Sequence, residues 1–420
     1  MAAPMLPAAV AEALVARHAE LAGISEPGPG VTRLFATDEH LRALDLVRRW
    51  MDAAGMTTRV DAAGNLVGRW AADPAAGNDP KVLLLGSHHD TVRQGGRYDG
   101  AMGVLLGIAC VEALAAAGTR LPYHLDVVCF SDEEGTRYGT SMIGSRAMAG
   151  VFDEAVLDWP DAAGVTMRDA MNGAGFDPDA MASCAYRPEA TLGYVEAHIE
   201  QGPVLEAEDL PVGVVTAIAV GSRHRVTVEG TAGHAGTVPM DRRRDALTAA
   251  AEMILAAERI AGEGDGVVAT TGKLEVSPGA INVIPGAVTF TVDLRAPDGA
   301  RHDGARETLA DALGGIAARR GVDLNLAQIY RSPGCAMDDD LRAGLGRAIA
   351  AAGYPVRALF SGAGHDALSL QHVGPVGMMF VRCKDGVSHN PAEYVAPADI
   401  VTAGEVLLRF LADFAPPKAA

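Results

Sequence analysis

The chain has 420 residues, of which 49% are hydrophobic and 21% charged, and its net charge is −18. This length allows two domains, and an acidic globular composition without clustered basic stripes argues against nucleic acid as a partner. No apolar run reaches the roughly 18 residues of a membrane span and we identify no signal peptide, so we expect no membrane contact. Five scattered cysteines without CxxC spacing favour reduced thiols and a cytoplasmic location.

The first half of the chain alternates predicted helices and strands. Its expected elements are a helix at 38–54, a strand at 82–85, a helix at 101–117, a strand at 125–130, and helices with surface loops over 151–190. Thr37 is placed to cap the first helix and Gly55 to end it. Strand, helix, strand is typical of a parallel α/β sheet.

From about residue 214 the strands alternate polar and apolar residues. The expected elements are strand 224–230, helix 242–260, strands 267–275 and 287–295, helix 303–319 and strand 324–330. This β-α-β-β-α-β order is that of a ferredoxin-like unit. The rest of the chain is expected to form helix 338–352, strands 356–360 and 376–381, and helix 398–414. We therefore predict an α/β domain of 1–213 and 331–420, with a mixed sheet flanked by helices, interrupted by an α+β domain of 214–330.

The stretch 82–103 carries polar residues in a glycine-rich loop after a buried strand. His88, Asp90 and Asp99 lie there, and catalytic side chains commonly follow the carboxyl ends of such strands. We interpret the loop as half of a metal site. His89 is set apart from this group, and we expect it at the surface.

An acidic loop, SDEEG, follows the strand 125–130 and contains Glu133 and Glu134. One carboxylate can bind a metal while its neighbour transfers protons. Taken alone, such a run is more often a solvated acidic loop.

Two histidines extend the pattern. Strand alternation places His198 and Glu200 on one face, and His389 lies in KDGVSHNPAE after the apolar strand 376–381. A single histidine is more often structural than a ligand. Together, however, histidines and carboxylates suit zinc or manganese, and a carboxylate bridging two ions would make a two-metal hydrolytic site.

A competing motif is GAGHDA at 362–367, which fits the GxGxxA dinucleotide fingerprint after strand 356–360. It comes too late in the chain for two mononucleotide-binding halves to follow. A glycine turn at a substrate pocket is the favoured interpretation.

These residues resemble the M20-type metallopeptidases, and within them the hydantoinase/carbamoylase branch, over about residues 35–415. The motifs that carry the resemblance are GSHHDTVRQGGRYDG, FSDEEGTRYGTSMIGSR, HIEQGPVLE, GTAGHAGTVPM, GAINVIPG, VDLR, SGAGHDA and KDGVSHNPAE. Peptidase relatives tend to carry a carboxylate at the position of His198, so HIEQGP favours the carbamoyl branch over peptide cleavage.

The resemblance implies two divalent metal ions per subunit, zinc or manganese, with cobalt a further candidate. The implied ligands are His88, Asp99 and His198 for one ion, and Asp99, Glu134 and His389 for the other. Glu133 resembles the general base of the family. Asp90 resembles its outer carboxylate that orients His88.

For substrate binding, the positions that match the family are Gln201, His234, Asn282, Arg295 and Gly364. The domain 214–330 would be a lid and dimerisation domain, which implies a homodimer. Arg295 suits a bidentate carboxylate clamp, although a surface salt bridge is the simpler interpretation of its strand position. His234 could hydrogen-bond a carbonyl oxygen as charge develops, or be a turn histidine.

The activity implied is metal-assisted hydrolysis of the ureido C–N bond of a small carboxylate-bearing substrate. The motifs VRCKDGVSHNPAE and RYDGAMGVLLGI look most like those of allantoate amidohydrolases, which convert allantoate to ureidoglycine, ammonia and carbon dioxide. N-carbamoyl-L-amino-acid hydrolase or β-ureidopropionase is the alternative. From another class, a non-catalytic binding protein with the same fold remains to be tested.

Overall fold

The computed structural model describes residues 5–77 and 79–415. The chain divides into two compact units. Unit 1 comprises Met1–Thr216, Met337–Leu359 and His365–Ala420, and unit 2 comprises Ala217–Ala336 and Phe360–Gly364. The roles expected for the two domains, metal binding and lid, stay predictions.

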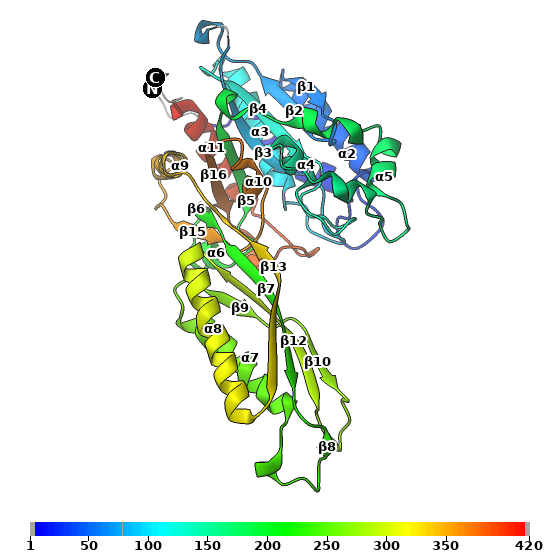
Figure 1. The fold of residues 1–420 in the computed structure, drawn as a ribbon. Helices are drawn as coiled ribbons and strands as arrows, with labels where there is room; N and C mark the ends of the chain where they lie inside the picture. The colour runs from blue at the N-terminus through cyan, green and yellow to red at the C-terminus, as the bar shows by residue number, and fades with distance from the viewer. Residues whose placement is uncertain (1–4, 78, 416–420) are drawn as a thin grey trace. The chain divides into compact units, whose positions relative to one another are not determined.

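A mixed sheet forms the centre of unit 1, in the order β1-β2-β4-β3-β5-β16-β6-β14, with β15 also pairing β6 (Figure 1). The strands are β1 Thr57–Val60, β2 Leu66–Trp70, β3 Val82–His88, β4 His124–Phe130, β5 Thr191–Ile199, β6 Val212–Ile218, β14 Cys335–Ala336, β15 Ala358–Ser361 and β16 Val376–Val381. The pairs β4–β3, β3–β5 and β5–β16 are parallel. The pairs β1–β2, β2–β4, β16–β6 and β6–β14 are antiparallel. The mixed α/β class predicted from the sequence is confirmed.

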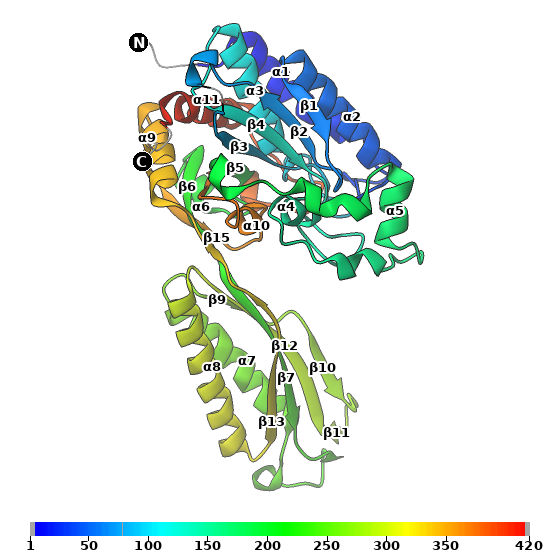
Figure 2. The same ribbon diagram turned by 45° about the horizontal axis from the view of Figure 1, so that its top comes forward.

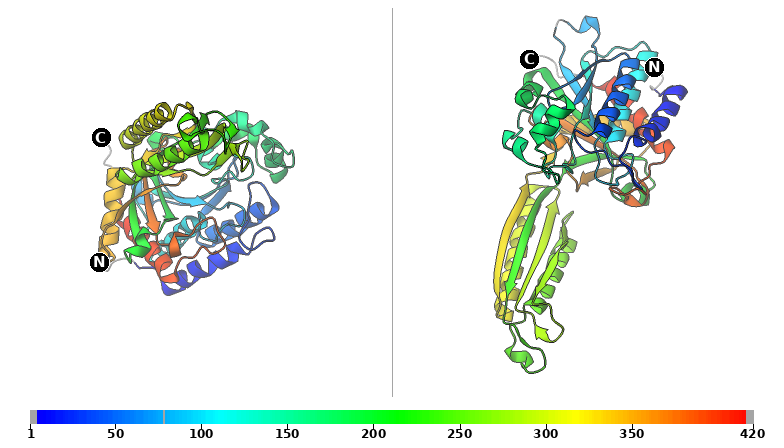
Figure 3. Two further views of the ribbon diagram at one scale, coloured as in Figure 1. Left: turned by 90° about the horizontal axis from the view of Figure 1, so that it is seen from below. Right: turned by 90° about the vertical axis from the view of Figure 1, so that its right-hand side faces the viewer.

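Helices cover this sheet. They are α1 Ala8–Ala22, α2 Asp38–Ala53, α3 Ala101–Ala116, α4 Ile143–Met148, α5 Met167–Ala174, α6 Val204–Ala207, α9 Asp339–Ala351, α10 Ala367–Leu370 and α11 Pro397–Asp413. α3 is buried along most of its length because it packs between β3 and two outer helices, α1 and α11, which lie side by side (Figure 3). The segment 151–190 forms α5 and short 3-10 helices, as expected.

The predicted ends of α2 are confirmed. The Thr37 side chain accepts a hydrogen bond from the His40 amide, and Gly55 follows the helix with a φ of 84°.

Unit 2 has the predicted ferredoxin-like order, β10-β12-β7-β13, with all pairs antiparallel. Its elements are β7 Val220–Glu229, β8 Gly233–His234, α7 Ala246–Glu263, β9 Val268–Thr270, β10 Leu274–Ser277, β11 Val283–Ile284, β12 Ala287–Ala296, α8 Gly299–Arg320 and β13 Asp323–Ser332. α7 and α8 pack against each other and cover one face of the sheet (Figure 2). The strand predicted at 267–275 is instead two strands, β9 and β10, because the chain leaves the sheet around Gly272.

A second prediction is wrong at the end of β5. The strand stops at Ile199, so His198 and Glu200 do not share a strand face. The Glu200 carboxylate instead accepts hydrogen bonds from the amides of Val204 and Leu205, at 2.8 and 2.9 Å, where α6 begins. Its role is therefore to cap that helix.

Three further sequence features have simple outcomes. The helix after GAGHDA is only the single turn Ala367–Leu370, which does not support a dinucleotide site. All five cysteines are buried and unpaired. Among the residues described, no helix combines the length and apolarity needed to cross a membrane.

Candidate metal centre

Parallel strands bring the predicted ligands to one edge of the sheet in unit 1. β3 ends at His88, β5 carries His198 as its next-to-last residue, and the loops after β4 and β16 carry Glu134 and His389. His88 was expected in a loop but is the last residue of β3, paired with Phe130 of β4. The position of its side chain is therefore fixed by the sheet.

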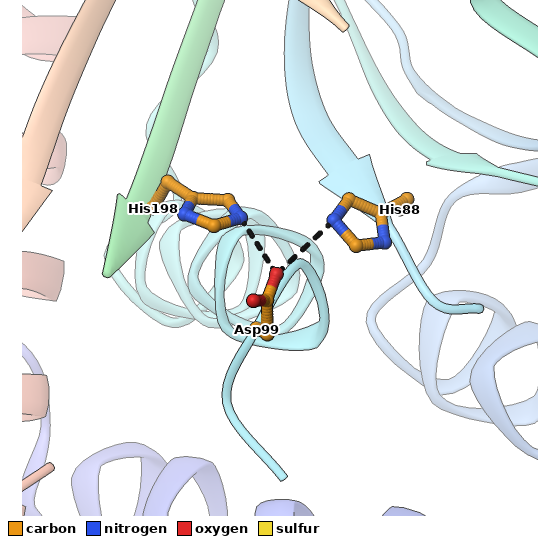
Figure 4. Close-up of side chains that lie close together, drawn as sticks. All are labelled: His88, Asp99 and His198. Atoms are coloured by element: carbon orange, nitrogen blue, oxygen red, sulfur yellow. Dashed lines mark ion pairs between the residues drawn. The ribbon is translucent and has the colours of Figure 1, made fainter. Parts of the chain in front are cut away.

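Asp99 lies between these ligands. Its Oδ1 is 3.4 Å from His88 Nε2 and 3.0 Å from His198 Nε2 (Figure 4). Its Oδ2 is 3.4 Å from His389 Nε2, which is in turn 3.3 Å from Glu134 Oε1. Asp99 thus belongs to two groups whose ligand atoms all lie within 4.8 Å of one another. We call His88, Asp99 and His198 cluster 1, and Asp99, Glu134 and His389 cluster 2.

The hydrogen bonding of the histidines in cluster 1 fits a divalent cation. His198 Nδ1 lies 2.9 Å from the Ile199 carbonyl, and His88 Nδ1 lies 3.1 Å from the Asp90 carbonyl. A cation that replaces the proton on Nε2 would be held by the Nε2 lone pair of each ring, while Nδ1 keeps its hydrogen bond to the carbonyl oxygen. Metal-binding histidines are held in this way.

The buried carboxylates around Asp99 also favour the binding of cations. Burial raises the pKa of Glu133 well above its ordinary value, and the nearby carboxylates Glu134 and Asp366 add to this, although His88 opposes it. Buried like charges are costly unless they are paired or bind metal. Asp99 itself is an anion, because its three histidine neighbours outweigh burial and hold its pKa well below the ordinary value.

Asp90 links the two halves of the site. Its carboxylate lies 3.3 Å from His88 Nδ1 and accepts hydrogen bonds from the amides of Glu133 and Glu134, at 3.0 and 3.1 Å. It therefore fixes a ring of cluster 1 and the acidic loop together.

Sequence reasoning missed two residues, Ser388 and Glu393. Glu393 is buried, and its Oε1 accepts hydrogen bonds from the amides of Tyr98 and Asp99, at 2.8 and 3.1 Å. Burial, with the Asp99 charge, raises the pKa of Glu393 to about 7. The Ser388 hydroxyl donates to Asp99 Oδ2 at 2.7 Å. The only indication in the sequence was that both residues lie in KDGVSHNPAE, the motif that contains His389.

His89 corrects a prediction. Its side chain is fully buried rather than at the surface, its ring packs on His40 with a centroid distance of 4.4 Å, and its Nδ1 lies 3.0 Å from the Phe130 carbonyl. Burial lowers its pKa to about 4, so the ring is neutral. It is a core histidine.

Gly100 supplies a testable link between the backbone and the site. Its φ is 63°, and a Cβ added there would lie 2.4 Å from the His88 ring. We expect Gly100→Ala to displace His88 and weaken cation binding by about 10- to 100-fold, the range seen when ligand orientation is disturbed. Gly118 has the same φ and no atom within 4 Å of such a Cβ, so Gly118→Ala is the matched control.

Both variants should lose about 1 kcal/mol of unfolding free energy from backbone strain. Only Gly100→Ala should release metal on dialysis, as measured by elemental analysis. Equal metal retention in the two variants would contradict the steric argument.

The structure places Gln201 beside Asp99. Its amide Nε2 lies 2.8 Å from Asp99 Oδ2 and 3.1 Å from Ser388 Oγ. The role of Gln201 in substrate binding stays a prediction.

The other predicted substrate residues lie in unit 2 and do not form one group. His234 in β8 and Asn282 are brought together, since the carbonyl of Asn282 accepts from the Ala235 amide at 3.0 Å, and both are exposed. Arg295 is near the carboxyl end of β12, about 26 Å from Ala287, the first residue of that strand, at roughly 3.3 Å per residue. Gly364 is exposed at the end of the segment Phe360–Gly364.

Arg295 makes the salt bridge that the sequence offered as the simpler interpretation. Its Nε and Nη2 donate to the two oxygens of Asp293 at 2.8 and 3.0 Å, and Nη1 donates to the Gly362 carbonyl. A guanidinium has five N–H donors, so two are left for a ligand. A cavity of about 470 Å³ is lined by Arg295 together with Arg223 and Thr270.

A mixed α/β sheet with two ligand clusters sharing a carboxylate is the kind of site that hydrolases use to bind two metal ions. The comparisons agree with this class. The profile of peptidase family M20/M25/M40 matches residues 84–413. The chain belongs to this family.

Individual relatives indicate which branch of the family the chain resembles. The chain is 42% identical over 382 residues to an N-carbamoyl-L-amino acid amidohydrolase of Geobacillus stearothermophilus, covering 91% of this chain and 93% of that protein. It is 37% identical over 428 residues to an allantoate deiminase of Arabidopsis thaliana, covering 94% and 81%. The crystal structure of a hydantoinase/carbamoylase family amidase from Burkholderia multivorans matches with a TM-score of 0.89 at 38% identity, covering 96% and 97%. The resemblance seen in the sequence is confirmed.

Proposed function

We propose that the protein is a metal-dependent amidohydrolase that cleaves the ureido C–N bond of a carboxylate-bearing small molecule. The observation that carries this proposal is the sharing of Asp99 by two ligand clusters, with the buried carboxylate of Glu133 beside them. Allantoate is the proposed substrate, and an N-carbamoyl-L-amino acid or N-carbamoyl-β-alanine is the alternative. The names of the two curated relatives support allantoate and N-carbamoyl-L-amino acids equally.

The proposed chemistry assigns separate tasks to the side chains. Bound divalent cations would supply Lewis acidity and lower the pKa of a water molecule. Glu133 takes the proton of the attacking water and returns it to the leaving nitrogen, which suits a carboxylate whose pKa is raised by burial. His234 donates a hydrogen bond to the carbonyl oxygen as negative charge develops. The carbamate produced then collapses to carbon dioxide and ammonia.

Two cations per chain are proposed, with zinc and manganese as the leading candidates and cobalt as a third. Neutral imidazole and carboxylate ligands accept all three, so metal identity needs measurement. The cytoplasm is the proposed location, supported by the unpaired buried thiols.

A substrate panel tests the function. Protein reconstituted with zinc or manganese should release ammonia from allantoate, with N-carbamoyl-L-amino acids and N-carbamoyl-β-alanine as the comparison substrates. Product identification distinguishes the candidates. Activity on dipeptides but on no ureido compound would overturn the proposal, and a folded protein that binds no cation would favour a non-catalytic binding protein.

Arg295 is proposed as the clamp for the substrate carboxylate. Arg295→Gln should lower kcat/KM by about 100-fold, mainly through KM, because two charge-assisted hydrogen bonds are lost. Arg295→Lys should not restore activity, since an ammonium cannot bind in the same bidentate way. The measurement compares kcat/KM for an N-carbamoyl amino acid with kcat/KM for its carboxamide, which has no carboxylate.

The effect of Arg295→Gln should disappear with the carboxamide. Arg244→Gln is the matched control, because Arg244 of unit 2 likewise donates to an aspartate, Asp323, at 2.9 Å and to a backbone carbonyl, that of Gly321, and does not line this cavity. A loss of equal size on both substrates would show that Arg295 acts through folding.

A homodimer is proposed because two predicted substrate-binding residues, His234 and Arg295, lie far apart within unit 2. His234 follows β7 at the end of the sheet where Ala287 begins β12, whereas Arg295 is near the opposite end of β12, about 26 Å away along the strand at roughly 3.3 Å per residue. One small substrate cannot reach both in a single copy. Mixing inactive Glu133→Gln and His234→Ala proteins should therefore restore activity when His234 acts on the partner's site. Random exchange gives about a quarter of wild-type activity, and no recovery on mixing would contradict a shared site.

A further inference from the structure

Asp99 Oδ2 makes more contacts than it can keep when a cation binds cluster 2. It accepts hydrogen bonds from the Ser388 hydroxyl at 2.7 Å and the Gln201 amide at 2.8 Å. A carboxylate oxygen has two lone pairs. A cation held by Asp99 Oδ2, Glu134 and His389 must therefore replace one of these two hydrogen bonds.

Cluster 1 carries a weaker conflict, because its one competing hydrogen bond among the described residues, from the Gly100 amide to His198 Nε2, is longer, at 3.2 Å. Asp99 Oδ1 faces His88 and His198, and no other described side chain donates to it. The histidines of cluster 1 are also buried, with side chains 2% and 1% exposed, whereas the His389 side chain is 49% exposed. Both differences favour tighter binding of a cation by cluster 1.

The Ser388 hydroxyl has a second acceptor within reach. Its oxygen lies 3.3 Å from Glu393 Oε2, while Glu393 Oε1 is occupied by two backbone amides. A serine hydroxyl has one hydrogen and can serve only one of the two carboxylates fully. Gln201 Nε2 donates to Ser388 Oγ at 3.1 Å and holds this oxygen between them.

We propose that the Ser388 hydrogen moves from Asp99 to Glu393 when a cation binds cluster 2. Ser388 thus competes with the second cation, and Glu393 relieves the competition by accepting the displaced hydrogen. The two cations of the proposed function, on which this inference rests, therefore bind with unequal affinity. Ser388 and Glu393 act as positioning residues that set the weaker site.

Opposite changes are expected from two substitutions. Ser388→Ala removes the competitor and should tighten the second, weaker step of Mn²⁺ binding by about tenfold, the scale of outer-shell effects on metal sites. Glu393→Gln should weaken the same step by about tenfold. Its amide oxygen must face the Tyr98 and Asp99 amides, so its NH₂ group replaces the acceptor that Ser388 needs.

The measurement is calorimetric titration of metal-free protein with Mn²⁺. The first binding step should be unchanged in both variants, and Glu393→Gln should have no effect on the second step in the Ser388→Ala background. Ser388→Thr keeps the hydroxyl and should behave as wild type. Ser25→Ala is the matched control, because the Ser25 hydroxyl contacts backbone groups of Glu26, Gly30 and Thr32 and no member of either cluster.

The outcomes separate this inference from the function on which it rests. A second step that is unchanged or weaker in Ser388→Ala overturns the inference, as does a Glu393→Gln effect that persists without Ser388. Two steps of equal affinity in the wild type also overturn it. Failure of the wild-type protein to bind any Mn²⁺, Zn²⁺ or Co²⁺ would instead overturn the proposed function.

Discussion

Glu133→Gln is expected to reduce kcat by at least about 10³-fold while the protein keeps both cations, because general acid–base catalysis typically contributes 10²- to 10⁴-fold. Glu133 is in neither cluster 1 nor cluster 2, although its carboxylate also lies within 4.8 Å of ligand atoms of His88 and Glu134. The amide has the shape of the carboxylate and cannot accept the proton. The rate of ammonia release at saturating substrate measures the loss of kcat. Elemental analysis of the purified variant measures whether both cations are kept.

The stability of the same variant gives an independent check. Burial raises the pKa of Glu133, so its carboxyl group makes the metal-free folded state less stable than a group that does not titrate would. The contribution has this sign above the ordinary pKa of a glutamate. Metal-free Glu133→Gln should therefore unfold at the same or a higher temperature than wild type. A large loss of both metal and stability would assign Glu133 a structural role instead.

Asp99→Asn is expected to have the broadest effect on metal binding. Asp99 is the residue common to clusters 1 and 2, and its pKa is held well below the ordinary value, so it supplies a full negative charge to both. We expect both cations to bind at least about 100-fold more weakly, beyond the 10- to 100-fold range of outer-shell changes. Turnover should be lost with them.

His389→Ala is the comparison for this prediction, because His389 belongs to cluster 2 alone. It should leave one cation per chain after dialysis, whereas Asp99→Asn leaves none. Elemental analysis of the dialysed proteins distinguishes the two patterns. One retained cation in Asp99→Asn would show that the carboxylate does not bridge the clusters.

Local patterns in the sequence determined much of the fold. The apolar run before His88 and the spacing in α2 and α3 predicted their elements because side chains repeat every two residues in a strand and every 3.6 in a helix. The β-α-β-β-α-β order of unit 2 was predicted for the same reason. Glycine and capping residues marked the ends, as Thr37 does for α2.

The sequence also determined the chemical types in the candidate site. Histidine and carboxylate residues after predicted strands indicated metal binding, and the number and order of the motifs indicated the family. No local pattern showed that His89 is buried or that Glu200 caps α6. These outcomes depend on which elements pack nearby, and a side chain's own segment does not encode that.

Only the tertiary structure decided which residues meet. The sheet order places β3 between β4 and β5, and this pairing brings Asp99 to His198 and His389, far away in sequence. Ser388 and Glu393 gained their importance in the same way, through contacts with the Asp99 loop. The separation of His234 from Arg295 likewise follows from strand pairing in unit 2. Such contacts depend on non-local pairing, whereas a sequence pattern reports only the local periodicity of one segment at a time.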